Sequence, residues 1–281
     1  MGAVMRYIMI LFLIMGFSSH AFCGENAESS IKNYILQADN DTFNWTKGRI
    51  IAAGSASMPE DLLYGERALR ASERNALIKA RKKLLNALLN INVNSSLTIQ
   101  DLVQNDSKAS DSLRALVHQS LVWETVYYHH PENRVEVHVF VDLWDEDARR
   151  LLPDSAFSSP QWDGGGSWGA VFLLGCDLVL DAREYGARPA LVPSFTDSEG
   201  NVIFRASVLG DGPWSKKSPV RYLRAGDEQV FESERDRIVF KPRGISGRQG
   251  SDFVLSEGDI ILLKEILDHF SADCQVNIIM R

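Results

Sequence analysis

Three histidines in the middle of the chain are the most obvious candidates for a metal site. His129 and His130 are adjacent, and His138 lies in the next predicted strand. A zinc site needs several such ligands converging on one point. Adjacent residues of a strand point to opposite faces of a sheet, so these side chains are not presented together. Gly164 to Gly166 lack the following Lys-Ser/Thr of a phosphate-binding loop. We therefore predict no metal and no cofactor.

Paired carboxylates are the second candidate, because an acid and a base side by side can move protons. An acidic run near the middle of the chain is formed by Asp142, Asp145, Glu146 and Asp147. A charge run at the edge of a domain is typical of a solvated surface. Ser55 and Ser57 lack the strand-to-helix turn that exposes a nucleophilic serine in hydrolases. We therefore predict no catalytic residue and a protein that is not an enzyme.

Asp181 and Arg183 are the least generic polar pair of the C-terminal half. One alanine separates them at the end of a predicted strand. Two interpretations fit this spacing: an ion pair at the strand end, or a contact to a ligand.

Cysteine pairing is the remaining candidate for covalent chemistry. Cys176 and Cys274 are the two cysteines outside the first 23 residues, and an even number in an exported chain favours a disulfide. The alternative is two buried free thiols, because cysteine is among the most buried residue types.

The element that organises the first half is a helix predicted over Pro59 to Asn92. Its main apolar stripe has helical spacing and is expected to lie on a core; it comprises Leu69, Ala76, Leu77, Ala80, Leu84, Ala87, Leu88 and Ile91. A second, narrower apolar line lies on nearly the opposite side and comprises Ala71, Ile78, Leu85 and Leu89. We predict that this partner-contact line is covered by the following short helix, by the second domain or by another subunit.

Strands on both sides of this helix are predicted to form one sheet. Arg49 to Met58 is rich in small residues, which permit a helix to approach closely. Val122 to His129 and Arg134 to Leu143 form a hairpin, and the second of these strands alternates strictly, with four valines on one face. This order predicts an α+β domain over residues 48–144, with helices on a mostly antiparallel sheet.

The segments around these elements are less regular. Residues 24–47 are polar with scattered apolar positions, which favours a lead-in containing a short helix. Val93 to Ile99 is expected to be a short strand, and Asp101 to Lys108 a polar interval. A short helix is predicted over Ser110 to Leu121, capped by Ser110 or Asp111.

Residues 145–167 are predicted to be a linker, because they contain two prolines and three consecutive glycines. The remainder, residues 168–281, is predicted to be a β-rich domain with one C-terminal helix, which Ser256 caps. Strands are expected at Ala170 to Asp181, Arg188 to Thr196, Val202 to Val208, Arg237 to Lys241, Asp252 to Leu255 and Gln275 to Met280. Residues 210–234 show no clear pattern.

The first 23 residues have the pattern of a secretory signal peptide. Arg6 precedes an apolar run from Tyr7 to Phe17, which is too short to span a bilayer. Small residues favour cleavage before Gly24, and cleavage before Phe22 is the close alternative. Lipoprotein processing would instead retain Cys23 as an acylated residue, so membrane association is expected only in that case. The predicted location is the periplasm or the periplasmic face of the outer membrane.

The overall charge excludes one class of partner. The 281 residues carry a formal net charge of −7, and the sequence pI is about 5.4. Proteins that bind nucleic acids normally present a concentrated basic face. The chain has only a short basic cluster on the predicted helix, so we predict no nucleic-acid partner.

Several stretches of the first half resemble a known family. They are Arg49 to Ala56, Ala68 to Ala76, Ile91 to Val93, and Tyr127 with Arg134 to Val139. On these stretches, residues 48–144 resemble the small bacterial outer-membrane lipoprotein family that includes the flagellar lipoprotein FlgP, and they are similar in layout to the N-terminal domain of the flagellar ring protein FlgT. The resemblance implies an envelope role, with association to the outer membrane or the flagellum, and no catalysis.

The second half resembles the C-terminal part of exported bacterial proteins with the same two-part plan. The stretches that carry this likeness are Leu180 to Arg183, Arg188 to Pro193, Asp197 to Gly200, Asp252 to Ser256 and Asp273 to Val276. We expect a non-enzymatic cell-envelope protein with a structural or assembly role, whose partner is an envelope protein or a second copy of itself. The alternative is a periplasmic ligand-binding or hydrolytic protein with a site at the domain junction.

Overall fold

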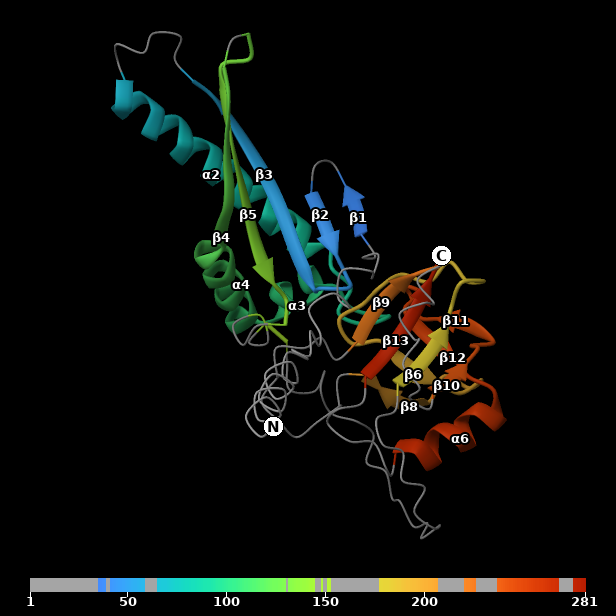
Figure 1. The fold of residues 1–281 in the computed structure, drawn as a ribbon. Coiled ribbons are helices and arrows are strands. Elements are labelled where there is room, and N and C mark those ends of the chain that lie inside the picture. Colours follow the sequence, from blue (N-terminus) through green and yellow to red (C-terminus); the bar gives the residue numbers. More distant parts are fainter. Residues whose placement is uncertain are drawn as a thin grey trace, which may run out of the picture. The chain divides into compact units, whose positions relative to one another are not determined.

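The structure is a computed structural model of the chain. It describes residues 35–38, 41–58, 65–129, 131–144, 148, 151–152, 177–206, 220–225, 237–267 and 275–281. These residues all belong to one unit, Lys32–Arg281. Figure 1 labels their helices and strands. Several predictions fall outside the described residues: the signal peptide, the start of the long helix at Pro59, His130, most of the linker, and the cysteines Cys176 and Cys274.

The first sheet has five antiparallel strands in the order β1-β2-β3-β5-β4. Their bounds are β1 Ile35–Ala38, β2 Asp41–Asn44, β3 Arg49–Ser57, β4 Leu121–Tyr128 and β5 Arg134–Asp142. The helix predicted in the lead-in is wrong for residues 35–38 and 41–44, which form β1 and β2. Pairing of β2 with β3 overrides the weak local pattern, and Phe43 stacks on Trp45 with 4.0 Å between ring centroids.

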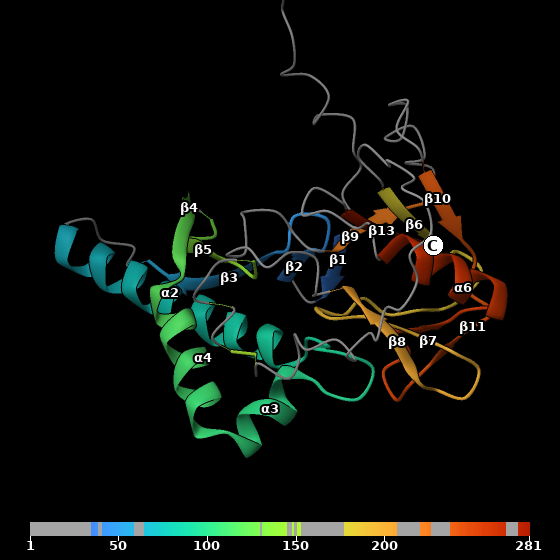
Figure 2. The same cartoon turned by 90° about the horizontal axis from the view of Figure 1, so that it is seen from below.

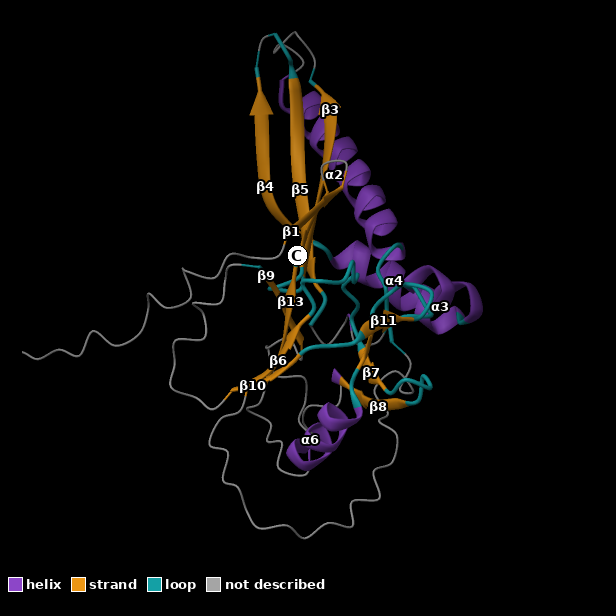
Figure 3. Cartoon of the chain, turned by 90° about the vertical axis from the view of Figure 1, so that its right-hand side faces the viewer, coloured by secondary structure: helices purple, strands orange, loops and turns teal. Residues whose placement is uncertain are grey.

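Helix α2, Gly65–Leu89, lies across one face of this sheet against β3 and β5 (Figure 3). Its buried residues include Ala76, Ala80, Leu84 and Leu88, so the predicted core-facing stripe is confirmed at these positions. Gly54 of β3 lies directly under the helix. A Cβ added to Gly54 would lie 2.2 Å from the amide nitrogen of Ala80 and 2.3 Å from the carbonyl oxygen of Ala76. The small residues of β3 therefore do permit close approach.

The helix ends three residues earlier than predicted. The amides of Asn90 and Ile91 donate to the carbonyls of Ala87 and Leu88, which tightens the last turn to i→i−3 bonding. Asn92 then bridges to Thr98 in an isolated β-bridge. The predicted strand at 93–99 is therefore wrong, because these residues form a bend closed by that single bridge.

Two helices follow where one was predicted. Helix α3 spans Ile99–Asn105 in the interval predicted to be irregular, and it starts with a reciprocal capping box between Thr98 and Asp101. Helix α4 spans Ser107–Gln119, and its N-cap is Asp106, not Ser110 or Asp111. Figure 2 shows α3 and α4 beside α2. The predicted linker begins within this core, because Ala148 and Leu151 are buried.

The hairpin of β4 and β5 is confirmed. The four valines of β5, at positions 135, 137, 139 and 141, are all buried, and the residues between them are half-buried. Strand β4 is the edge of the sheet, and its register with β5 shifts at a bulge between Val122 and Glu124.

The described residues of the C-terminal half form two four-stranded sheets. One is parallel, in the order β10-β6-β13-β9, with bounds β6 Asp177–Asp181, β9 Val220–Arg224, β10 Arg237–Phe240 and β13 Gln275–Met280. The other is mixed, in the order β11-β12-β7-β8, with bounds β7 Ser194–Thr196, β8 Val202–Arg205, β11 Gly244–Ser246 and β12 Asp252–Val254. Only the last three residues of the strand predicted at 188–196 are in a strand, and β9 lies where no element was assigned.

Helix α6, Glu257–Leu267, is the predicted C-terminal helix of a β-rich half. Ser256 caps it: the amide of Asp259 donates to the Ser256 hydroxyl oxygen at 3.1 Å. Ile260, Leu263 and Ile266 are buried, as the apolar spacing predicts. The chain therefore has the predicted α+β fold, with helices on an antiparallel sheet followed by a β-rich region. Within the part of the chain that the structure describes, no helix has the length and apolarity needed to cross a membrane.

Candidate functional site

Asp181 and Arg183 form an ion pair at the end of β6. The Arg183 Nε atom lies 2.8 Å from one carboxylate oxygen of Asp181, and its Nη2 atom lies 2.6 Å from the other. The Arg183 hydrogen bonds hold the pKa of Asp181 below its usual value. Both carboxylate oxygens are therefore engaged by a residue of the same turn, which is the geometry of a structural pair.

The predicted partner-contact line on α2 divides into two parts. Ala71 and Ile78 are exposed, and Ile78 is 59% accessible to solvent. Leu85 and Leu89 are half-buried and pack against the core. Only the N-terminal part of the line is therefore open to a partner.

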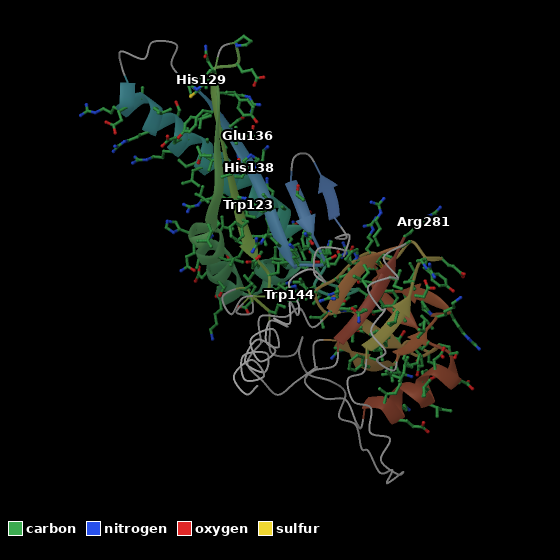
Figure 4. The ribbon with its side chains drawn as sticks, viewed as in Figure 1. Trp123, His129, Glu136, His138, Trp144 and Arg281 are labelled. Carbon is green, nitrogen blue, oxygen red and sulfur yellow. The ribbon has the colours of Figure 1, made fainter. Side chains whose placement is uncertain are left out.

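The histidines of the hairpin lie apart. His129 follows the last residue of β4 and is exposed, whereas His138 lies in the middle of β5 with its Nε2 atom 3.0 Å from Glu136 (Figure 4). No group of three or more metal-binding side chains occurs among the described residues.

The outer face of the hairpin, which is the face turned away from α2, carries paired charges and aromatic rings. Arg49 binds both carboxylate oxygens of Asp142, at 2.6 and 2.8 Å, and its guanidinium carbon lies 4.2 Å from the centre of the Phe140 ring. Trp123 packs edge-on against Phe140 and remains 53% exposed. These contacts fix the orientation of Trp123 but leave its surface open.

A second cluster on the same face lies nearer the hairpin turn. Arg134 binds Glu132 at 2.7 Å and also binds Glu136. Its guanidinium carbon lies 3.8 Å from the centre of the Tyr128 ring, which belongs to β4. Stacking of a guanidinium on an aromatic ring is favourable, and the two carboxylates together outweigh the single positive charge of Arg134 in this cluster.

Sequence reasoning missed a cluster centred on Asp252. The hydroxyl of Ser95 donates to one carboxylate oxygen of Asp252, and the amide of Ser194 donates to the other at 3.3 Å. Burial raises the pKa of Asp252. Ser95 lies 157 residues from Asp252 in the chain, so no local pattern links the two.

Backbone contacts hold the same loop in place. The amides of Leu191 and Val192 donate to the carbonyls of Asn92 and Val93 at 2.9 and 2.8 Å, and the amide of Gln249 donates to the carbonyl of Ser95 at 2.7 Å. We call the contacts of residues 92–95 with the C-terminal half the clasp. Only 8% of Ser95 is exposed, so its hydroxyl is not available to a substrate. The clasp therefore has a structural role: it connects residues 92–95 to the C-terminal half.

A half-open cavity of about 250 Å³ lies between α3, α4 and the start of the predicted linker. It is lined by Leu97, Asp101, Leu102, Asn105, Asp106, Ala109 and Leu151. Its two carboxylates cap helices: Asp101 accepts from the Thr98 amide and Asp106 accepts from the Lys108 amide. The remaining lining is mainly apolar, and the cavity lacks the convergent polar groups of a specific ligand site.

Comparison with known protein families finds a match for the C-terminal half. Residues 177–281 match the family model of the second domain of Treponema pallidum Tp0624. No curated protein matches the chain. The matched stretch starts at the first residue of β6 and includes both sheets of the C-terminal half together with α6. The C-terminal half is thus similar to the second domain of another protein.

Proposed function

We propose that this chain is an exported, non-enzymatic protein of the bacterial cell envelope with a structural or assembly role. The observation that carries the proposal is the distribution of exposed apolar side chains in the first half. They lie on α2 and β4 and comprise Ile78, Leu121, Val122, Trp123 and Tyr127. Contiguous exposed apolar surface marks protein–protein contacts, and Leu121, Val122 and Trp123 are consecutive in β4.

The polar chemistry of the chain supports the same proposal. Asp181, Asp142 and Asp252 each bind a neighbouring side chain of the same molecule. A catalytic carboxylate must instead be within reach of a substrate proton. The resemblance to the flagellar lipoprotein family, together with the signal-peptide pattern, favours a place at the periplasmic face of the outer membrane or near the flagellum.

The proposal is tested by isolating the native protein from the envelope fraction and identifying what accompanies it. The Ile78→Glu variant places a charge on the exposed part of α2, and Asn75→Glu adds the same charge at an exposed polar position of the same helix. We expect Ile78→Glu to lose an envelope partner that wild type and Asn75→Glu retain. Equal recovery of all partners by the three proteins would contradict a role for this surface, and recovery of no envelope protein by wild type would contradict the proposal.

Mass spectrometry of the same preparation identifies the N-terminus. A chain starting at Gly24 or Phe22 indicates export with cleavage, and an acylated Cys23 indicates a lipoprotein. A chain that retains Met1 in the cytoplasmic fraction would contradict export.

A further inference from the structure

Strands β6 and β13 form the centre of the parallel sheet, with β10 on one side and β9 on the other (Figure 1). Asp177, the first residue of β6, pairs with Gln275, the first residue of β13. The pairing continues without a shift to Asp181 and Ile279. The two strands therefore begin at the same level of the sheet and run side by side.

Each of these first residues is preceded by a cysteine. Cys176 is bonded to Asp177, and Cys274 is bonded to Gln275. Both cysteines lie outside the described residues, but the backbone of the residue that follows each is described. In a parallel ladder the positions that precede a pair are also in register, and their side chains share one face of the sheet. The register of β6 with β13 thus favours Cys176 opposite Cys274.

The spacing of neighbouring strands suits a disulfide. Strands that share a ladder lie about 4.7–4.9 Å apart, and the Cα atoms of a disulfide are usually about 4.4–6.8 Å apart. Two cysteines in register on adjacent strands are therefore within bonding reach. A register shifted by one residue would turn one of the thiols to the opposite face of the sheet.

The chain uses cysteine sparingly, which makes the matched positions more telling. It contains three cysteines, and Cys23 lies in the predicted signal peptide. Each of the other two directly precedes one of the two central strands of the same sheet. An even number of cysteines after the signal peptide favours pairing in an exported chain.

We propose that Cys176 and Cys274 form a disulfide that links β6 to β13 where both strands begin. The inference rests on the export in the proposed function, because disulfides form and persist in oxidising compartments. The new bond joins the two Sγ atoms, and each thiol gives up one proton and one electron. A disulfide of a thiol–disulfide oxidoreductase accepts both protons and both electrons and becomes two thiols.

This link closes a long loop of the C-terminal half. Strands β9 and β10, the whole of the mixed sheet and helix α6 lie between the two cysteines in the chain. Closing such a loop restricts the unfolded chain, so the disulfide stabilises the folded C-terminal half. It also fixes the register of two parallel strands that are distant in sequence.

Peptide mapping of the full-length protein tests the pairing. The protein is isolated from the envelope fraction, its free thiols are alkylated, and it is digested without reduction. We expect one pair of linked peptides, containing Cys176 and Cys274, which a reducing agent separates. Free thiols at both positions overturn the proposal, and so does a disulfide from either cysteine to Cys23 or to a second chain.

Moving one thiol by a single residue tests the register. The variant Cys274→Ser/Gln275→Cys keeps the number of cysteines but turns the thiol to the other face of the sheet. Reduced, folded wild type and variant are exposed to oxidised glutathione, and circular dichroism establishes that both are folded. We expect the variant to form the link to Cys176 at least about tenfold more slowly than wild type. Equal rates overturn the register.

Thermal unfolding tests whether the link stabilises the fold. Cys176→Ser, Cys274→Ser and the double variant should all lower the midpoint by the same amount, at least about 5 °C. The three losses are equal because each variant removes the same bond. A reducing agent should lower the midpoint of wild type similarly and leave the variants unchanged. Additive losses in the double variant overturn the proposal, because they indicate two separate buried thiols.

The disulfide and the envelope role fail in different ways. Protein that is isolated from the envelope with both thiols free overturns the disulfide and leaves the envelope role standing. Protein that is reduced and cytoplasmic in cells, yet forms the Cys176–Cys274 bond with oxidised glutathione, supports the pairing and overturns the envelope role.

Discussion

Gly54 sets the distance between α2 and the sheet at the scale of a single residue. The helix backbone occupies the space that a side chain at this position would need, with the amide nitrogen of Ala80 2.2 Å from an added Cβ. Real Cβ atoms do not approach backbone so closely, and a helix backbone cannot move without disturbing the core on both sides. The small-residue pattern of β3 was a sequence signal for this contact.

We predict that Gly54→Ala destabilises the protein by about 1–3 kcal/mol or more, because overpacking forces α2 away from β3. The free energy of unfolding is measured by urea denaturation. Gly186→Ala is the matched control, since an added Cβ at Gly186 meets nothing within 4 Å. Equal stability of the two variants would show that the helix can shift at no cost.

Asp252 illustrates a residue that sequence alone could not identify. Asp181 was singled out because its partner Arg183 is two positions away, whereas the partners of Asp252 come from distant loops. Burial raises the pKa of Asp252 above 3.8, so the folded protein holds this proton to a higher pH than the unfolded chain does. The contribution of Asp252 to the free energy of unfolding is therefore greatest below about pH 3.8 and declines as the pH rises through the folded-state pKa.

We predict that Asp252→Asn removes this dependence, because an amide cannot ionise. Urea unfolding of both proteins between acidic and neutral pH measures the effect: the stability of wild type relative to Asp252→Asn should fall as the pH rises. A relative stability that rises with pH would mean that the carboxylate is stabilised in the fold.

Helix α2 shows at the scale of an element what periodicity can predict. The stripe of Ala76, Ala80, Leu84 and Leu88 is visible in the sequence because a core imposes helical spacing. The second line was also visible, but its two halves have different surroundings, since Leu85 packs against the core and Ile78 does not. Which part of this line is buried depends on contacts with residues that are distant in sequence.

We predict that alanine substitutions on these two faces change stability by very different amounts. Leu84 is fully buried, so Leu84→Ala should cost about 2–5 kcal/mol of stability through lost burial and the remaining cavity. Ile78 is 59% exposed, and Ile78→Ala should change stability by less than about 0.5 kcal/mol. Chemical denaturation of the two single variants measures the difference. A large loss with Ile78→Ala would show that this side chain is part of the core.

The elements that sequence missed are short or polar. Strands β1, β2, β9 and β11 have three to five residues, which is too few for an alternating pattern to stand out. Helix α3 has a polar composition, and the capping box at Thr98 identifies its start only when the helix is already suspected. Strictly alternating β5 and apolar β13 were predicted because their side chains meet a core along their length.

At the scale of the whole molecule, the clasp joins elements that the sequence places in separate domains. Ser95 is held by the Gln249 amide and by Asp252, and Gly247 lies against it. Gly247 has a φ of +80°, and an added Cβ would lie 2.2 Å from the Cβ of Ser95. A side chain at Gly247 must therefore displace the loop of the first half.

We predict that Gly247→Ala weakens the coupling between the two halves. Wild type should unfold in a single calorimetric transition, whereas the variant should show a broadened or divided one, with a calorimetric enthalpy above the van't Hoff enthalpy. Gly200→Ala distinguishes the steric clash with Ser95 from backbone strain. Gly200 has a similar φ of +88°, but an added Cβ there meets nothing within 4 Å. Gly200→Ala should lower the midpoint and keep one transition, since it carries the backbone strain without the clash. A divided transition in both variants would assign the effect to backbone strain, and a single transition in both would mean that the halves stay coupled without the clasp.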